Sequence, residues 1–337
     1  MPLSHSLAAL VVTAIWGLSF VVIKLGVGTT PPLLLAALRF LFAALPAVFF
    51  VPRPRTDWRN VVAYGFFLGV AQFGLLFAAL AIGMPASLAS VVMQAQVFFT
   101  ILFAALVMGE RPGPHQVIGG VVASLGLVLI AWPRMTGGGA VPFLMTVIAA
   151  ASWGVANIVS KRASRVDMPA HRAEKGTRFS PTRPSGSAPN EAPARKKSTR
   201  WIPKVPSTFG SGALGLIVWS SLVAPLPLFG LSLWLDGPDR VLAALAQIDG
   251  GTLAAVAYLA YPTTIFAFGI WAYLLSRHPA ATVTPFALFV PVAGILGSAL
   301  ILGEAMHPIE AVGGAVIVMG LAVNVFGARL LRRLRLE

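Results

Sequence analysis

Gln94 and Gln96 interrupt an apolar run that is long enough to cross a membrane, SVVMQAQVFFTILFAALVMGER. A buried amide without a hydrogen-bond partner costs roughly 2–7 kcal/mol, so polar groups of the protein or a watery cavity must meet these side chains. Successive helical residues turn by about 100°, and the two glutamines are therefore expected to face different neighbours. Two interpretations stay open. At least one amide lines a cavity, where it suits a zwitterionic ligand because it both donates and accepts, or both amides join neighbouring helices.

Arg39 is the only charged residue that falls well inside an apolar segment, PPLLLAALRF. An ionisable residue within a membrane span is a functional candidate by default. Its guanidinium is suited to bind a substrate carboxylate through two parallel hydrogen bonds; alternatively, it bonds backbone carbonyls or reaches the membrane surface. Every Asp and Glu maps to a connection or to the end of an apolar segment, so none is available there as a fixed partner, which favours a ligand or a carbonyl. Gln72 is a further candidate to line such a cavity.

Aromatic, amide and hydroxyl groups on other segments complete the set of candidate substrate-contacting residues. Trp153 and Asn157 are four residues apart and so share one helix face. We expect this face, and that of Trp16, to line a cavity; close packing beside neighbouring glycines is the alternative. Tyr261 adds a hydroxyl beside a proline in the stretch LAYPTT.

Two prolines, Pro285 and Pro291, are expected to interrupt a single apolar helix in TPFALFVPVAG. Proline lacks the backbone donor that a helix interior requires. Broken helices are common beside transport sites, although a packing kink without a ligand explains them equally well.

Four charged residues lie at the ends of apolar segments: Lys24, Lys161, Glu110 and Glu304. Long charged side chains at such positions commonly extend to the membrane surface. The two glutamates end similar stretches, TILFAALVMGE and GILGSALILGE, and the two lysines follow similar Trp-Gly pairs. This correspondence makes all four residues candidate gates.

The composition is that of an all-α polytopic membrane protein. Of 337 residues, 57% are hydrophobic and 11% are charged, whereas a soluble domain usually carries about 25% charged residues. The net charge of +14 does not indicate nucleic acid, because the basic residues gather in a few connections rather than on a face. The chain has no cysteine. No metal site, cofactor motif or catalytic constellation is expected, so the pattern argues against an enzyme.

Ten segments are apolar enough to span a bilayer, which needs roughly 20 residues each. The spans are expected at residues 7–26, 31–51, 60–81, 86–108, 115–132, 141–160, 207–231, 252–275, 280–302 and 308–328. Basic residues favour the cytoplasmic side, and their distribution predicts that both termini are cytoplasmic. The basic stretch 161–206 is rich in Pro and Ser and is predicted to be a disordered cytoplasmic loop. Residues 329–337 are predicted to form a basic cytoplasmic tail.

The chain also repeats itself. Gly119, Gly120 and Gly126 correspond at one constant spacing to Gly313, Gly314 and Gly320. The repeats are expected at 1–135 and at 136–328, each with five helices. Because five is odd, the second repeat enters the membrane in the opposite sense. Inverted repeats place a binding site near the midplane, between the halves, with alternating access around it.

The stretches WGLSFVVIK, PPLLLAALRF, GMPASLASVVMQAQVFFT, GER and LFVPVAGILGSALILGE resemble the EamA family of the drug/metabolite transporter superfamily. The resemblance covers nearly the whole chain, apart from the long stretch 164–206. It implies ten helices in two inverted halves, location in the bacterial inner membrane, and efflux of small metabolites from the cytoplasm. Within the family the similarity favours export of cysteine-pathway amino acids such as O-acetylserine and cysteine.

Other functions stay open at this stage. The cargo is alternatively another small polar metabolite or a drug-like compound. A membrane scaffold that docks partners through the loop 161–206 is a further alternative. The expected partners are a small polar substrate and the lipid bilayer, without nucleic acid. The sequence is silent on oligomeric state.

Overall fold

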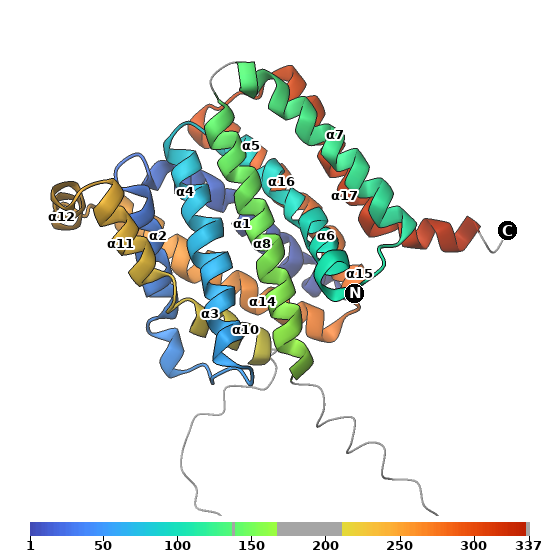
Figure 1. The fold of residues 1–337 in the computed structure, drawn as a ribbon, viewed down its shortest axis with the longest axis horizontal. Coiled ribbons are helices and arrows are strands. Elements are labelled where there is room, and N and C mark those ends of the chain that lie inside the picture. Colours follow the sequence, from blue (N-terminus) through green and yellow to red (C-terminus); the bar gives the residue numbers. More distant parts are fainter. Residues whose placement is uncertain (137–138, 167–210, 335–337) are drawn as a thin grey trace, which may run out of the picture.

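The computed structural model describes residues 1–136, 139–166 and 211–334, and every regular element in these residues is helical. Ten helices in the described residues are long and apolar enough to cross a membrane. They pack side by side into a bundle, and α8 ends at the same end of it at which α10 begins (Figure 1). The predicted all-α class with ten spans is confirmed.

The first five spans lie close to their predicted positions. They are α1 (Leu3–Gly26); α2 (Pro32–Ala44) with η1 (Ala47–Phe49); α3 (Trp58–Tyr64), η2 (Gly65–Phe73) and α4 (Gly74–Ala81); α5 (Ala86–Val92), η3 (Met93–Ala95) and α6 (Gln96–Met108); and α7 (Pro114–Thr136).

The second five spans include more irregular helices. They are α8 (Ala140–Val166); α10 (Ser211–Ser220) with α11 (Pro225–Leu235); α13 (Gly250–Tyr258), η4 (Leu259–Phe266) and α14 (Ala267–Arg277); α15 (Ala280–Val283), η5 (Thr284–Leu288), α16 (Phe289–Gly297) and η6 (Ser298–Leu302); and α17 (Pro308–Leu334).

Three predicted boundaries are corrected. Span 7 was expected over 207–231, but a turn divides it into α10 and α11, and it extends to Leu235. Pro225 begins α11, because a first-turn proline forfeits no helical hydrogen bond. A short helix not predicted from the sequence, α12 (Pro238–Ala246), follows.

Helices extend into the predicted loop 161–206 and into the predicted tail 329–337. Helix α8 continues to Val166, into the loop predicted from residue 161, and the rest of that loop up to 206 lies outside the described residues. Helix α17 continues to Leu334, into the predicted tail 329–337. The predicted disorder of the loop therefore stays a prediction.

Departures from α-helical geometry occur in corresponding spans of the two halves. Spans 3 and 8 each contain a π-helical segment, η2 and η4. Spans 4 and 9 each contain a 3₁₀ turn, η3 and η5. Mid-helix changes of this kind are frequent at functional sites, and these four spans meet at the centre of the bundle.

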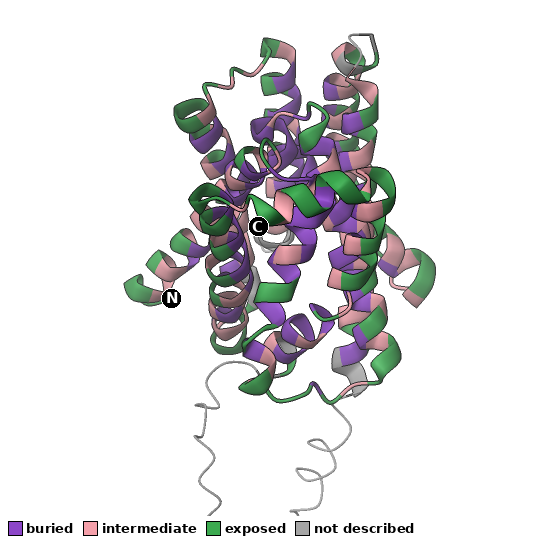
Figure 2. Cartoon of the chain, turned by 90° about the vertical axis from the view of Figure 1, so that its left-hand side faces the viewer, coloured by how far each residue is buried: buried purple, intermediate pink, exposed green. Residues whose placement is uncertain are grey.

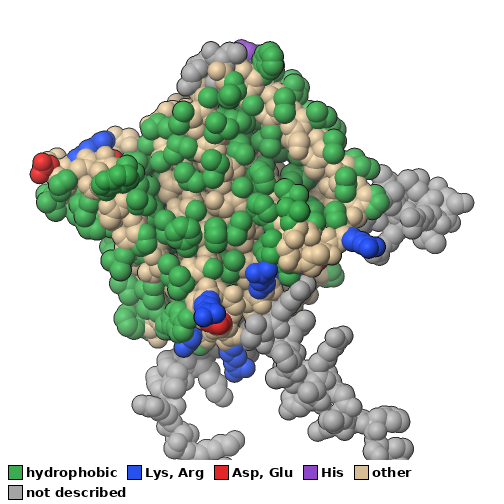
Figure 3. Space-filling model, in the orientation of Figure 1, with side chains coloured by type: hydrophobic (Ala, Val, Ile, Leu, Met, Phe, Trp, Pro, Cys, Tyr) green, Lys and Arg blue, Asp and Glu red, His purple; other side chains and the backbone are tan. Residues whose placement is uncertain are grey.

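Apolar side chains cover the outer surface of the bundle. Leu226, Leu300 and Trp132 are 81%, 84% and 71% exposed, and hydrophobic side chains dominate the face seen in Figure 3. The buried residues concentrate between the helices (Figure 2). A surface this apolar is stable only against lipid.

Exposed basic side chains gather at one end of the bundle, the end at which α8 ends and α10 begins (Figure 3). This end is called the basic end, and its exposed Lys and Arg side chains are Arg53, Arg55, Arg59, Arg111, Lys161, Arg162 and Arg277. At the opposite end, the basic side chains that the structure describes are Lys24 and Arg240.

Candidate functional site

A cavity of about 660 Å³ lies between the helices, and each of the ten spans contributes at least one lining residue. Its walls combine apolar and aromatic side chains with a small set of polar ones. The polar side chains of the wall are Ser19, Arg39, Tyr64, Gln72, Gln94, Gln96, His115, Asn157, Ser160, Thr263, Thr284 and Asn324. Apolar walls with a few placed polar groups are typical of small-molecule sites.

The cavity extends toward the basic end and stops short of the opposite end. Ser160, Leu275 and Asn324, all near the basic ends of their helices, line it. On the other side, its last lining residues in spans 1 and 3 are Ile23 and Leu76. Beyond them, Phe77, Leu80 and Met84 are fully buried. The structure therefore shows a cavity directed at one end of the bundle.

Both Gln94 and Gln96 line this cavity, and they differ in the contacts that they make there. The chain forms a 3₁₀ turn at η3, where residues turn by about 120°, so the two side chains diverge by about 120° rather than 160°. The Gln94 side chain is buried. Gln96 also joins a neighbouring helix: its Oε1 accepts a hydrogen bond from Asn157 Nδ2 at 2.8 Å.

Asn157 ties α8 to α6 at the wall of the cavity. Besides Gln96, its Nδ2 donates to Thr100 Oγ1 at 3.0 Å. Thr100 Oγ1 in turn donates to the Gln96 carbonyl at 2.7 Å. Interhelical hydrogen bonds in membranes average about 0.6 kcal/mol, so this cluster fixes the two helices modestly. Both interpretations of the glutamine pair, cavity lining and helix contact, hold for Gln96.

Arg39 is 1% exposed and lines the cavity. Its Nη2 donates to Thr264 Oγ1 at 3.2 Å, and the guanidinium carbon lies 3.8 Å from the ring centroid of Phe73. Its Nε and Nη1 are buried without a hydrogen-bond partner among the described residues. The alternatives of carbonyl bonding and of reaching the membrane surface are therefore wrong.

Two further buried atoms on the cavity wall also lack a partner among the described residues. They are Gln72 Oε1 and Thr263 Oγ1, and both residues are almost fully buried. Gln72 was expected from the sequence. Thr263 was not expected from the sequence. The signal that could have identified it is the proline that directly precedes it within an apolar span, in LAYPTT.

Trp16 and Trp153 both line the cavity. Trp16 Nε1 donates to the carbonyl of Thr263 at 3.2 Å, and its ring lies 5.1 Å from Phe268 and 5.2 Å from Trp271, centroid to centroid. This aromatic cluster forms part of the wall toward the basic end.

Tyr261 does not line the cavity, and the sequence interpretation of this residue is corrected. It is 40% exposed on the outer surface. Thr263 lines the cavity instead, and residues two apart lie on nearly opposite faces of a helix, so Tyr261 is turned away. The predicted interruption of span 9 is observed: Pro285 is the second residue of the 3₁₀ turn η5, and Pro291 lies in the first turn of α16. Neither proline lines the cavity itself.

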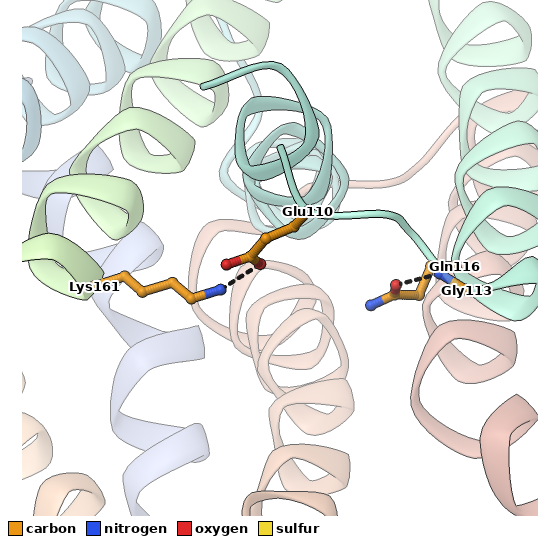
Figure 4. A network of polar contacts seen from close by, with 4 residues as sticks. All are labelled: Glu110, Gly113, Gln116 and Lys161. Carbon is orange, nitrogen blue, oxygen red and sulfur yellow. Dashed lines mark hydrogen bonds and ion pairs between the residues drawn. The ribbon is translucent and has the colours of Figure 1, made fainter. Parts of the chain in front are cut away.

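The four candidate gate residues form different contacts at the two ends. At the basic end, Lys161 Nζ pairs with Glu110 Oε2 at 2.5 Å, and both side chains are partly exposed (Figure 4). At the opposite end, Lys24 Nζ donates instead to the carbonyls of Leu80 and Met84, at 2.8 and 3.1 Å.

Glu304 caps the N-terminus of α5. It accepts hydrogen bonds from the backbone N–H groups of Ala86 and Ser87, at 3.2 and 3.1 Å, and from Ser87 Oγ. A carboxylate is favourable at a helix N-terminus because it meets unpaired donors there. Span 9 is thereby fastened to span 4 at the end where the cavity is closed.

Among the described residues, no group of His, Asp and Glu is arranged to hold a metal ion. The chemistry of the wall is that of hydrogen bonding, one cation and aromatic surface. Such a site binds and releases a small molecule and lacks the paired acid and base of a hydrolase.

Comparison with known proteins identifies relatives of this chain. The chain matches the family described as "EamA-like transporter family" twice, over residues 3–132 and 204–326. It is 37% identical over 95% of its length to a "Probable amino-acid metabolite efflux pump" of Escherichia coli (strain K12), covering 94% of that protein. It is 37% identical over 98% of its length to a protein of the same description from Salmonella typhimurium, covering 97% of that protein.

A solved structure described only as "Crystal structure of protein" has the same fold, with a TM-score of 0.58 and 22% identity. The match covers 97% of this chain and 98% of that one. Two family matches in one chain also agree with the internal repeat read from the sequence. From its sequence, its ten spans and these matches, the chain belongs to the EamA-like transporter family.

Proposed function

We propose that the protein exports small amino-acid metabolites, with O-acetylserine and cysteine as the expected cargo, from the cytoplasm by alternating access. The observation that carries this proposal is the cavity that all ten spans line, which places a few polar side chains in apolar walls and is directed at one end of the bundle. The efflux-pump relatives support the class of cargo.

The basic end is proposed to face the cytoplasm. Positively charged connections are retained on that side, and seven exposed basic side chains mark this end. Both termini are then cytoplasmic. The membrane is proposed to be the bacterial inner membrane, because the relatives are bacterial and the outer membrane is spanned by β-barrels.

With this orientation the observed conformation receives substrate from the cytoplasm. Release then requires the opposite end to open, so Lys24 must leave the carbonyls of Leu80 and Met84, and Glu304 must leave the start of α5. Lys161 and Glu110 are proposed to take over corresponding contacts at the basic end. In transporters built from inverted repeats, alternating access is largely a rocking of one repeat against the other around the fixed site.

Export by overexpressing cells tests the proposal. Cells that produce the protein are expected to release more O-acetylserine and cysteine than cells with the empty vector. Gln94→Leu, at matched membrane level, is expected to abolish the increase, because the buried amide faces the cavity. Gln247→Leu is the control, because that glutamine is exposed after α12. Unchanged release from wild-type cells would contradict the cargo.

A second candidate is export of a larger apolar or drug-like compound. The aromatic wall of Trp16, Phe268 and Trp271 favours it. In the same cells, increased tolerance of aromatic toxic compounds without amino-acid release would support this candidate over the first.

A further inference from the structure

Unpartnered buried polar atoms concentrate on the cavity wall. The described residues hold five such side-chain atoms: Arg39 Nε, Arg39 Nη1, Gln72 Oε1, Thr263 Oγ1 and Ser298 Oγ. The first four belong to three cavity-lining residues. Buried polar groups are nearly always hydrogen-bonded in folded proteins, so their concentration at one place indicates that a ligand completes their bonds.

The three residues come from three spans and line one cavity. Arg39 in α2 stacks on Phe73, which directly follows Gln72 in span 3. It also donates to Thr264 Oγ1, which directly follows Thr263 in span 8. Thr264 Oγ1 is held in turn by its own hydrogen bond to the Leu259 carbonyl, at 2.8 Å within η4. The guanidinium is therefore fixed in orientation with two donors left unused.

The unused groups are of two kinds. Arg39 Nε and Nη1 are donors of a cation, and Nη2 keeps a second hydrogen besides the one that it donates to Thr264. Nη2 forms one edge of the guanidinium with Nε and another with Nη1, and either edge matches the two oxygens of a carboxylate. Gln72 Oε1 is an acceptor, and Thr263 Oγ1 accepts as readily as it donates; these match an ammonium group. An unpaired buried charge is costly, and no described Asp or Glu bonds to Arg39.

We propose that Arg39, Gln72 and Thr263 form a subsite for the zwitterionic head of an α-amino acid. Arg39 binds the carboxylate, while Gln72 and Thr263 bind the ammonium. The amino-acid side chain then extends into the remaining cavity, toward the glutamines of span 4. This assignment rests on the proposed function and narrows it, because molecules that carry only one of the two charges are excluded.

Analogues that lack one charged group test the assignment. The purified full chain in proteoliposomes takes up radiolabelled cysteine under reducing conditions, and three unlabelled compounds compete. They are cysteine, cysteamine, which lacks the carboxylate, and 3-mercaptopropionate, which lacks the ammonium. For the wild type, each truncated analogue is expected to compete at least about tenfold more weakly than cysteine, because each leaves buried groups unpaired.

Variants then assign each charged group to its residue. Arg39→Lys keeps the charge but loses the planar fork. In this variant, cysteine and 3-mercaptopropionate are expected to compete about tenfold more weakly than in the wild type, and cysteamine is expected to compete equally well. In Thr263→Val and in Gln72→Leu, cysteine and cysteamine are expected to compete more weakly than in the wild type, and competition by 3-mercaptopropionate is expected to be unchanged. Thr252→Val is the matched control on span 8, because Thr252 bonds Thr30 away from the cavity. If competition by all three compounds were weakened equally in every variant, the assignment of the subsite would be overturned.

A second experiment distinguishes a wrong assignment of the cargo from a wrong assignment of the subsite. If cysteine is not taken up, thermal stabilisation of the purified chain by serine, ethanolamine and 3-hydroxypropanoate repeats the comparison without transport. If serine stabilises the wild type but not Arg39→Lys, the subsite is supported and cysteine is rejected as the cargo. Absence of stabilisation by any of the three would overturn the subsite. The same stabilisation by serine in the wild type and in Arg39→Lys would also overturn it.

Discussion

The carbonyl oxygen of Gly320 in α17 lies 2.6 Å from the position that a β-carbon on Gly119 in α7 would occupy. The same relationship holds between Gly126 and the carbonyl of Gly313, also at 2.6 Å. Helices α7 and α17 lie side by side along their length (Figure 1). Reciprocal contacts between corresponding residues are what a two-fold axis relating the halves produces. They support the inverted repeat that the sequence predicts.

Gly119→Ala is expected to destabilise the protein, because its methyl group would meet the backbone of α17. Overpacking typically costs about 1–3 kcal/mol, which exceeds the gain of up to about 1 kcal/mol from helix propensity. The adjacent Gly120→Ala is the control, since its β-carbon would meet only the Phe98 ring at 3.6 Å. Thermal unfolding in detergent measures both. A lower midpoint for Gly120→Ala than for Gly119→Ala would contradict the packing.

The Gln96–Asn157 hydrogen bond is expected to couple α6 to α8. Gln96→Leu and Asn157→Leu should each lower the free energy of unfolding, and the double variant should lower it by less than the sum. The coupling is expected at about 0.6 kcal/mol, the average for membrane interhelical bonds. A double-mutant cycle from reversible unfolding in mixed micelles measures it. Strict additivity would show that the bond contributes nothing.

Glu304 and Glu110 occupy corresponding positions but are expected to differ in their contribution to stability. Glu304→Ala removes a charged acceptor from two backbone donors, and such bonds contribute about 1.5–3 kcal/mol. Glu110→Ala breaks a partly exposed ion pair, which contributes about 0–1 kcal/mol. Each variant therefore serves as the control for the other in the same unfolding assay. Equal losses would argue against the capping role.

Stability is expected to rise with pH because of His278, which follows α14 at the basic end. Its Nε2 lies 2.7 Å from Nδ1 of His5. Burial holds the pKa of His278 below its ordinary value, and His5, the N-terminal ammonium and Arg277 lower it further. The unfolded chain thus takes up the proton first as the pH falls below about 6.5. This contribution is complete above that pH and is lost below it.

His278→Gln should flatten the dependence of the unfolding midpoint on pH between about 5 and 7. The glutamine keeps a hydrogen-bonding group but does not titrate in this range. A series of thermal unfolding curves for the two proteins makes the comparison. An identical slope for the wild type and the variant would assign the dependence to other groups.

The sequence by itself determined the class of the protein and the residue types of its site. Hydrophobicity and length are local properties, and the bilayer demands about 20 apolar residues per span, so ten spans were countable. The high cost of a buried charge made Arg39 conspicuous among apolar neighbours, and the buried amides Gln72 and Gln94 stood out for the same reason. The repeat was visible because corresponding glycines keep one spacing.

Only the tertiary structure decided which side chains share the cavity. A helical wheel assumes one angle per residue, but the chain departs from it at the 3₁₀ turn η3, beside which Gln94 and Gln96 line one cavity. Whether Thr263 or Tyr261 faces the cavity depends on how span 8 is rotated against its neighbours. The different partners of Glu110 and Glu304 were equally hidden, since similar local sequences stand at both ends of the bundle. Which end is closed depends on how ten helices pack together, and that is a property of the whole chain.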